Sequence, residues 1–191
     1  MISLVTARLV LGRWRDDNVA SMSAINAEPE VMRWIGGGSV GDEQQTKAAI
    51  ETFERRWDQR GFGMFALELR ATGGLIGFTG LAVPQFLPEV MPAVEIGWRL
   101  GRAFWGRGLA TEAAAATLRF GLLDRNLGQI ISIAQVGNGA SERIMGSSAC
   151  AWPGRPSVPP ATARAGSTRS PGQSTWRQAQ GQTATAGPGV T

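Results

Sequence analysis

The sequence predicts an α+β fold in which a mixed β-sheet is flanked by helices. Apolar stretches of strand length alternate with helical patterns in the order β-α-α-β-β-β-α-β-α. Two of the strands, at residues 64–70 and 75–83, are joined by a short segment whose composition is typical of a hairpin. A third strand, at 94–100, runs into a glycine-rich turn and an alanine-rich helix. A chain of 191 residues is long enough to form one such domain with a sizeable core.

The first half of the chain begins with a strand at residues 8–14 and continues with three helices. Asp16 and Asp17 can cap a helix that ends near residue 26, and Pro29 suits the first turn of a short second helix. After a run of three glycines, Asp42 can cap a long helix that ends near residue 60. Apolar residues recur along this helix at helical spacing: Ala49, Ile50, Phe53 and Trp57.

The second half adds the hairpin strands and two further strand–helix pairs. A loop at 84–92 with three prolines separates the hairpin from the strand at 93–100. The helix after the glycine turn is expected from about residue 109 to residue 124. A strongly apolar strand follows at 129–136, and a further helix begins at 141–145.

Composition excludes several classes of protein. The chain has no histidine, which removes His-based triads and the commonest metal ligand, so no metal is expected. One cysteine and no secretory signal fit a cytoplasmic location, and no apolar run of about 18 residues predicts a membrane span. Of 19 Lys and Arg residues, four lie beyond residue 145, which leaves 15 against 15 acidic residues before it. A DNA-binding face is therefore not expected.

The composition of the glycine-rich turn favours an anion as its ligand. Gly106 and Gly108 carry no Cβ, so the backbone can come close to a ligand. The first amides of the following helix have no partner inside it and point into the turn, where the helix dipole also favours negative charge. A phosphate or pyrophosphate is the simplest ligand. The alternative is an ordinary strand–turn–helix in which the glycines only reverse the chain.

The longer string Trp105-Gly-Arg-Gly-Leu-Ala-Thr-Glu-Ala resembles the pyrophosphate loop of the GNAT superfamily of N-acetyltransferases. It is most similar to the subgroup that acetylates ribosomal-protein N-termini, in which a Trp at this position is habitual. Other stretches agree with that subgroup in the same order: Thr6-Ala-Arg-Leu-Val-Leu, Gly61-Phe-Gly, Gly74-Leu-Ile-Gly-Phe-Thr-Gly-Leu and Asn138-Gly-Ala-Ser-Glu-Arg-Ile-Met. The resemblance implies the GNAT fold, with a central, mostly antiparallel, twisted sheet.

The resemblance implies an enzyme that transfers the acetyl group of acetyl-CoA to a primary amine, either a protein N-terminus or a small amine. An amide near Trp98, Arg99 or Leu100 would polarise the thioester carbonyl. Asn138 would contact the pantetheine arm, and Arg107 would add charge near a phosphate or remain a solvated loop residue. The residues expected to hold the pyrophosphate form one loop: Trp105, Gly106, Arg107, Gly108, Leu109, Ala110 and Thr111.

Two residues are the candidates for proton transfer. Glu95 lies in an apolar strand, where partial desolvation would raise its pKa towards that of a useful base. Its alternative role is a structural ion pair with an arginine such as Arg99. Ser141 is the candidate acid for the departing thiolate, because the chain has no tyrosine; its alternative role is to cap the following helix. Glu112 is a weaker base candidate, since its place in the first helical turn also complements the dipole.

The chain changes character at residue 146. Residues 146–191 lack Leu, Ile, Phe, Met, Lys, Asp and Glu and contain six of the ten prolines. This composition predicts a disordered tail after an incomplete acetyltransferase domain at 1–145, with the last strands missing. The family motif continues after Met145 with one residue and then Lys-Leu-Gly-Met, which a one-base shift can recover. An out-of-frame tail is therefore favoured over a natural linker, and reduced activity is expected.

Two other functions compete with the acetyltransferase. A non-catalytic acyl-CoA-binding remnant would keep the pyrophosphate loop but lack the acceptor half. A nucleotide-binding module is the weaker alternative, because no acidic residue about 20 positions past the loop is placed to bind a ribose. The sequence predicts acetyl-CoA and an amine as ligands, and it predicts neither the acceptor's identity nor the oligomeric state.

Overall fold

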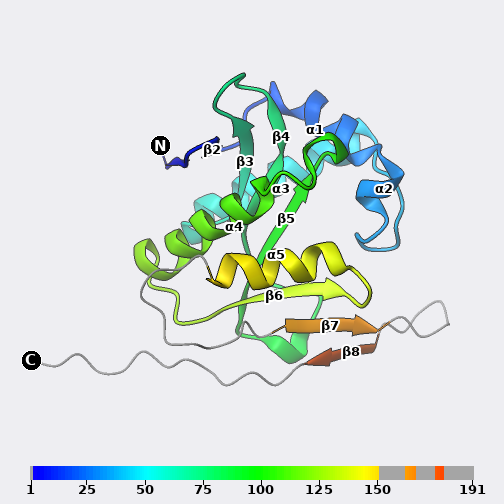
Figure 1. The fold of residues 1–191 in the computed structure, drawn as a ribbon, viewed down its shortest axis with the longest axis vertical. Coiled ribbons are helices and arrows are strands. Elements are labelled where there is room, and N and C mark those ends of the chain that lie inside the picture. Colours follow the sequence, from blue (N-terminus) through cyan, green and yellow to red (C-terminus); the bar gives the residue numbers. More distant parts are fainter. Residues whose placement is uncertain (1, 151–161, 167–174, 179–191) are drawn as a thin grey trace, which may run out of the picture.

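A computed structural model describes residues 2–150, 162–166 and 175–178 of the chain. They form one sheet with helices on both of its faces (Figure 1). The strands are β1 (Leu4–Val5), β2 (Leu9–Gly12), β3 (Met64–Leu69), β4 (Leu75–Ala82), β5 (Val94–Leu100), β6 (Ile130–Gln135), β7 (Thr162–Gly166) and β8 (Thr175–Gln178). The α-helices are α1 (Asn18–Asn26), α2 (Pro29–Met32), α3 (Glu43–Arg60), α4 (Leu109–Arg119) and α5 (Gly139–Cys150). Two short 3₁₀ helices are η1 (Pro88–Val90) and η2 (Arg102–Phe104), and a π-helix, η3 (Phe120–Asp124), continues α4.

The long helix α3 is delimited by the signals that the sequence carries. Asp42 accepts a hydrogen bond from the Gln45 amide at 2.7 Å, and the Gln45 side chain accepts one from the Asp42 amide at 3.0 Å. This reciprocal capping box satisfies two amides that have no partner within the helix. At the other end Gly61 adopts a left-handed φ of 71° and donates to the Trp57 carbonyl. The predicted boundaries of this helix are therefore confirmed.

The strands lie in the order β1-β2-β3-β4-β5-β6-β7-β8. All neighbouring pairs are antiparallel except β5–β6 and β6–β7, which are parallel. The β5–β6 register covers only three pairs, from Val94↔Ile130 to Ile96↔Ser132. On its other edge β5 stays paired with β4 as far as Leu100. The second half of β5 therefore has a paired edge towards β4 and an open edge where β6 diverges.

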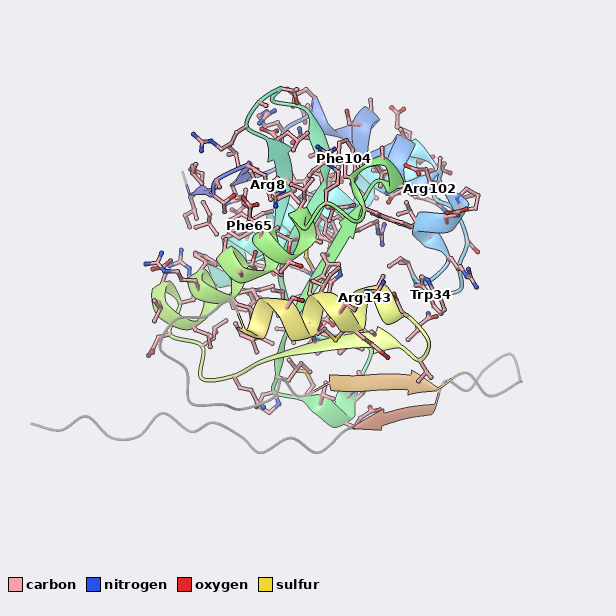
Figure 2. All side chains as sticks on the ribbon, in the orientation of Figure 1. Arg8, Trp34, Phe65, Arg102, Phe104 and Arg143 are labelled. Atoms are coloured by element: carbon pink, nitrogen blue, oxygen red, sulfur yellow. The ribbon has the colours of Figure 1, made fainter. Side chains whose placement is uncertain are left out.

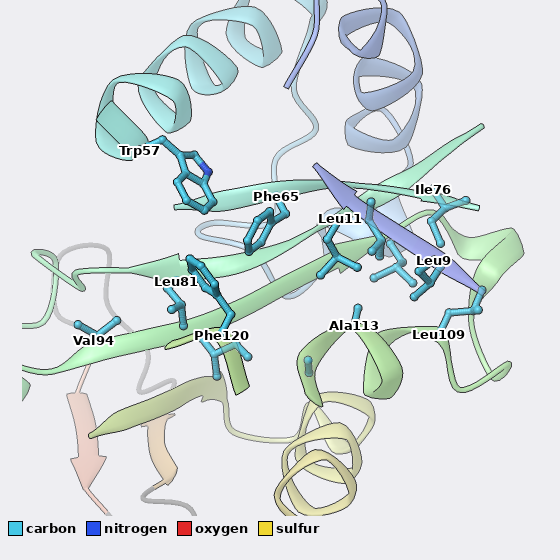
Figure 3. Packing of buried hydrophobic residues seen from close by; sticks show 14 residues of the cluster. Leu9, Leu11, Trp57, Phe65, Ile76, Leu81, Val94, Leu109, Ala113 and Phe120 are labelled. Carbon is cyan, nitrogen blue, oxygen red and sulfur yellow. The ribbon is translucent and has the colours of Figure 1, made fainter. Parts of the chain in front are cut away.

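Two apolar clusters hold the helices on the sheet. The larger one lies between the sheet and α4 and includes Leu11, Phe65 and Ala113, all of which are completely buried (Figure 3). The smaller one packs α1 and α3 against the opposite face and contains Trp14, Met22 and Phe78 among its residues. Removal of this apolar area from water is the main stabilising term. It also fixes α1 and α4 on opposite sides of β5.

The mixed sheet with flanking helices confirms the predicted fold class. The structure differs from the prediction at the C-terminal side, where no further strands were expected. β7 pairs in parallel with β6, and β8 pairs with β7. The prediction rested on the absence of aliphatic side chains, but strand pairing at the free edge of β6 uses backbone groups that every residue here supplies. Helix α5 also continues past residue 146 to Cys150. The predicted tail at 151–161, 167–174 and 179–191 lies outside the described residues.

Within the described ranges, no helix combines the length and the apolar character that crossing a membrane requires. The same part of the chain contains no group of three or more Cys, Asp or Glu side chains that could hold a metal ion.

Candidate active site

A cleft of about 420 Å³ opens where β5 and β6 diverge. Its floor is formed by Trp98, Arg99 and Leu100 at the end of β5, and one wall by the glycine loop and the start of α4. The opposite walls come from α5 and from the segment around α2. The volume is within the range of small-molecule sites. The cleft therefore combines an open strand edge with a helix N-terminus.

The glycine loop is tied to the end of β5. The Trp105 indole N–H donates to the Leu100 carbonyl at 2.8 Å, so the ring holds the loop against the strand. Gly106 and Gly108 have φ angles of 71° and 74°, in the left-handed region that favours glycine. Gly108 is the N-cap of α4, and no side chain caps that helix end. The amides at the start of α4 are therefore available to a ligand in the cleft.

A second set of contacts fixes this loop from the N-terminal side of the chain. Glu112, in the first turn of α4, accepts hydrogen bonds from the Thr6 hydroxyl at 2.6 Å and the Arg8 amide at 2.9 Å. Arg8 Nε donates to the same carboxylate at 2.6 Å, and Arg8 Nη1 donates to the Arg107 carbonyl at 2.9 Å. Arg8, directly before β2, thus contacts both the loop and α4 through one side chain (Figure 2).

These contacts decide the role of Glu112. Burial opposes ionisation, but the hydrogen bonds from Thr6 and Arg8 outweigh it and hold the pKa of Glu112 below its usual value. A carboxylate that is ionised and occupied by three donors is poorly suited to accept a proton from an amine. Arg107 does not line the cleft; its carbonyl anchors Arg8 instead.

The start of α5 brings Asn138 and Ser141 to the cleft. The Ser141 amide donates to Asn138 Oδ1 at 3.2 Å, so Asn138 is the residue that caps this helix. The alternative role of Ser141 as the cap is therefore wrong. The Asn138 side-chain amide and the Ser141 hydroxyl have no hydrogen-bond partner among the described residues, and both residues line the cleft.

The segment after α2 closes one end of the cleft. The Gln135 side chain donates to the Gly36 carbonyl at 3.1 Å, which ties this segment to the end of β6. The Trp34 ring lies against Gly137, where a Cβ would come within 3.7 Å of it. Arg143 of α5 lines the cleft as Trp34 does, and the two side chains reach it from different elements (Figure 2). Contacts between distant parts of the chain therefore shape this end.

Glu95 lies below the cleft, in the part of β5 that is still paired with β6. It stands opposite Ile131 in the register and does not line the cleft surface. Burial raises the pKa of Glu95 to about 7, and the charge of Arg56 on α3 opposes this rise. Ion pairs found in the described part of the chain do not include Glu95, and Arg99 has a different partner. The alternative of a Glu95–Arg99 pair is therefore wrong.

Arg99 points from β5 towards α1. Its Nη1 donates to Asn26 Oδ1 at 2.6 Å, and its guanidinium carbon lies 5.1 Å from the centre of the Phe78 ring. Burial lowers the pKa of Arg99 to about 10, so the side chain remains charged at neutral pH.

The structure brings most of the predicted site residues to one cleft; Glu95, Arg107 and the weaker candidate Glu112 are the exceptions. Several lining residues had no predicted role, among them Glu30, Val31 and Arg143, whereas Trp34 was expected in the core or in a cleft wall. Only the tertiary packing of α2 and α5 brings them to β5. The sequence also did not predict that Thr6 and Arg8 bind the Glu112 carboxylate. Both residues belong to a stretch that carried the resemblance.

Comparison with known proteins agrees with this architecture. Residues 8–149 match the family model of the acetyltransferase (GNAT) domain. The protein YkkB of Bacillus subtilis is 32% identical over 142 residues, which cover 74% of this chain and 80% of YkkB. The crystal structure of an acetyltransferase from Agrobacterium tumefaciens is 26% identical with a TM-score of 0.65, covering 76% of this chain and 81% of that one. RimL, a ribosomal L7/L12 α-N-protein acetyltransferase solved with coenzyme A, has the same fold at 16% identity, with a TM-score of 0.63 and coverage of 76% and 81%.

Proposed function

The chain belongs to the acetyltransferase (GNAT) family, and from that membership we propose that it is an acetyl-CoA-dependent N-acetyltransferase acting on a primary amine. The observation that carries the proposal is the divergence of β6 from β5 beside a loop with two left-handed glycines. A strand edge can pair with an extended amide-containing arm, and a helix N-terminus can hold a pyrophosphate. RimL, which was solved with coenzyme A, has the same fold.

The residues of the cleft fit the chemical parts of acetyl-CoA. The amides of the 105–111 loop and the start of α4 would hold the pyrophosphate. The open edge of β5 near Trp98 to Leu100 would bind the pantetheine amides, and the Asn138 side-chain amide would add a donor. When bound, acetyl-CoA supplies the thioester whose acetyl group is transferred.

Three groups of this chain would act on protons and charge. Glu95 would take a proton from the attacking amine through water, since its pKa of about 7 suits a base at neutral pH. A backbone amide near the end of β5 would stabilise the negative charge that develops on the carbonyl oxygen. The Ser141 hydroxyl, which lines the cleft, would donate a proton to the departing thiolate.

The decisive experiment is calorimetric titration with acetyl-CoA, followed by thiol release assays with a panel of amines. Gly108→Asp is expected to abolish binding, because it forces a side chain into the left-handed region and adds negative charge to the loop. Gly128→Ala is the control, since its Cβ meets nothing within 4 Å and it lies outside the cleft. Unchanged affinity in folded Gly108→Asp would remove the loop from the site.

Turnover separates the enzyme from a non-catalytic acyl-CoA-binding protein. Binding of acetyl-CoA without thiol release from any amine would favour the binding protein. The panel includes peptides with free N-termini and small amines, because the acceptor follows from their relative kcat/KM values. A cytoplasmic location, consistent with the single cysteine, is part of the same proposal.

The origin of residues 146–191 forms a separate proposal. Their composition and the family continuation Lys-Leu-Gly-Met support an out-of-frame origin of the chain after residue 145, even though α5, β7 and β8 include residues from this part. Sequencing of the coding DNA around codon 146 tests this directly. A sequence in which no single-base correction restores Lys-Leu-Gly-Met would reject it.

A further inference from the structure

Arg99 carries a charge that the described part of the protein does not neutralise. No carboxylate among the described residues lies within 4.0 Å of it, and its Nε is buried without a hydrogen-bond partner. Of its three nitrogens, only Nη1 has a partner there, the neutral side chain of Asn26. Arg99 as a whole is half-buried, and a charge partly removed from water is stabilised by an anionic partner, so this arginine is suited to bind an anion.

The surroundings hold the guanidinium in one orientation. Asn26 is itself fixed, because its side-chain amide donates to the Thr46 hydroxyl at 2.9 Å and Thr46 donates to the Asp42 carbonyl at 2.8 Å. This chain of hydrogen bonds directs Asn26 Oδ1 at Arg99. The Phe78 ring supports one face of the guanidinium. An arginine that is held by one nitrogen and by one face is preorganised to bind a planar anion through its remaining donors.

Arg99 is placed to contact the acceptor rather than a phosphate of the cofactor. Arg99 lines the cleft, but its side chain is directed to α1, on the face of the sheet opposite α4 and the glycine loop. By strand alternation Glu95, Gly97 and Arg99 share this face of β5. Gly97 leaves the strand between them without a side chain. Four residues of strand separate the two backbones by about 13 Å.

The other cationic side chains near the cleft are differently placed. Arg102 is exposed and pairs with Glu30 at 3.0 Å, so its charge is already compensated. Arg143 lies on α5, at the far wall. Arg99 is therefore a cleft-lining cation on the α1 side of the strand, the side on which Arg56 of α3 acts on Glu95.

We propose that Arg99 binds a carboxylate of the acceptor, so that the substrates are amines that also carry a carboxylate group. The proposal rests on the acetyltransferase function and narrows its acceptor class. The amine would reach the end of β5 with Glu95 on one side, while the carboxylate would form paired hydrogen bonds with Arg99. The requirement for both groups would exclude simple alkylamines and neutral amides.

The test compares matched acceptors. Glycine, β-alanine and 4-aminobutyrate are each assayed against their carboxamides, which keep the amine and remove the charge. At least one acid is expected to exceed its carboxamide by about tenfold or more in kcat/KM. Arg99→Gln is expected to abolish this preference, and Arg99→Lys to retain part of it. The calorimetric Kd for acetyl-CoA is expected to stay within about twofold in both variants, since the proposed contact is to the acceptor.

Arg102→Gln is the matched control, because it removes the same charge from an exposed residue close to the cleft. Equal kcat/KM values for acids and carboxamides in the unaltered protein would overturn the proposal, whether or not the variants fold. So would an unchanged preference in Arg99→Gln, or a large loss of acetyl-CoA affinity in that variant, which would assign Arg99 to the cofactor.

A second readout separates this inference from the proposed function. If no amine is turned over, the acids and carboxamides are titrated calorimetrically into the protein with and without coenzyme A. Binding of an acid, but not of its carboxamide, that depends on Arg99 would support the anion site even though the proposed catalysis had failed. Absence of such binding would overturn it.

Discussion

Replacement of Glu95 by Gln tests the electrostatics of β5 in two independent ways. Burial raises the pKa of Glu95 from 4.5 to about 7. That difference corresponds to about 3 kcal/mol, which is the cost of ionising this carboxyl group in the folded protein rather than in the unfolded chain. Gln has a similar size and no charge, so it removes this cost while keeping most of the packing.

The sign of the pH dependence follows directly. Below pH 4.5 Glu95 is protonated in both states and ionisation costs nothing. Between pH 4.5 and about 7 the unfolded chain loses this proton first, so the contribution of Glu95 to stability falls as pH rises. Above pH 7 the full cost applies. Glu95→Gln should therefore raise the Tm at pH 8.5 by up to about 6–12 °C and change it little at pH 4.5.

Catalysis should respond in the opposite direction. A base must be ionised, so the kcat of the unaltered protein should rise with pH through about 7. Glu95→Gln should lower kcat by about 10²-fold and flatten this profile, while the Kd for acetyl-CoA is retained. Thermal unfolding at the two pH values and a pH–rate profile are the assays, with Glu51→Gln on the exposed side of α3 as the control.

Two results would refute the reasoning. Equal effects of Glu95→Gln on the Tm at pH 4.5 and pH 8.5 would show that the carboxyl group is not desolvated in the folded state. A kcat within a few-fold of the parent, with the same pH dependence, would show that Glu95 is structural and that another group accepts the proton.

Three further predictions concern the loop, the proton donor and the C-terminal strands. Arg8→Ala should raise the Kd for acetyl-CoA about tenfold and leave kcat at saturation within about twofold, because Arg8 positions the loop and Glu112 without touching the reacting atoms; equal affinity in calorimetry would contradict this. Ser141→Ala should lower kcat while the Tm stays unchanged, since Asn138 caps α5; an unaltered kcat would exclude Ser141 as the acid. In hydrogen exchange, the pairing of β7 with β6 predicts protection of the β7 amides, and fast exchange there would contradict this pairing.

Local sequence signals were sufficient to predict the main helices and strands of residues 1–145. Asp42 and Gln45 form the capping box that their spacing predicts, and the hairpin between β3 and β4 lies where its turn residues stand. These features depend on neighbours within a few residues, so the sequence displays them directly. The glycine loop belongs to the same class, because φ near +70° is a local requirement that Gly106 and Gly108 meet.

Strand pairing at the C-terminal edge was not predictable in this way. The prediction relied on side-chain composition, whereas β7 pairs with β6 through backbone groups. The same limit applies to Ser141, whose role as a helix cap was equally plausible from sequence. The neighbouring Asn138 takes that role, and only the geometry of the turn decides between the two.

The sequence by itself determined the order of the elements, the fold class and the residues of the loop that begins α4, because each is encoded by periodicity or by residues close together in the chain. Tertiary structure alone decided which distant groups meet. It brings Arg8 to Glu112, leaves Glu95 half-buried near Arg56, and turns Arg99 towards Asn26 rather than Glu95. The charge state and the partners of these side chains depend on burial and on elements many residues away, and no local pattern records either.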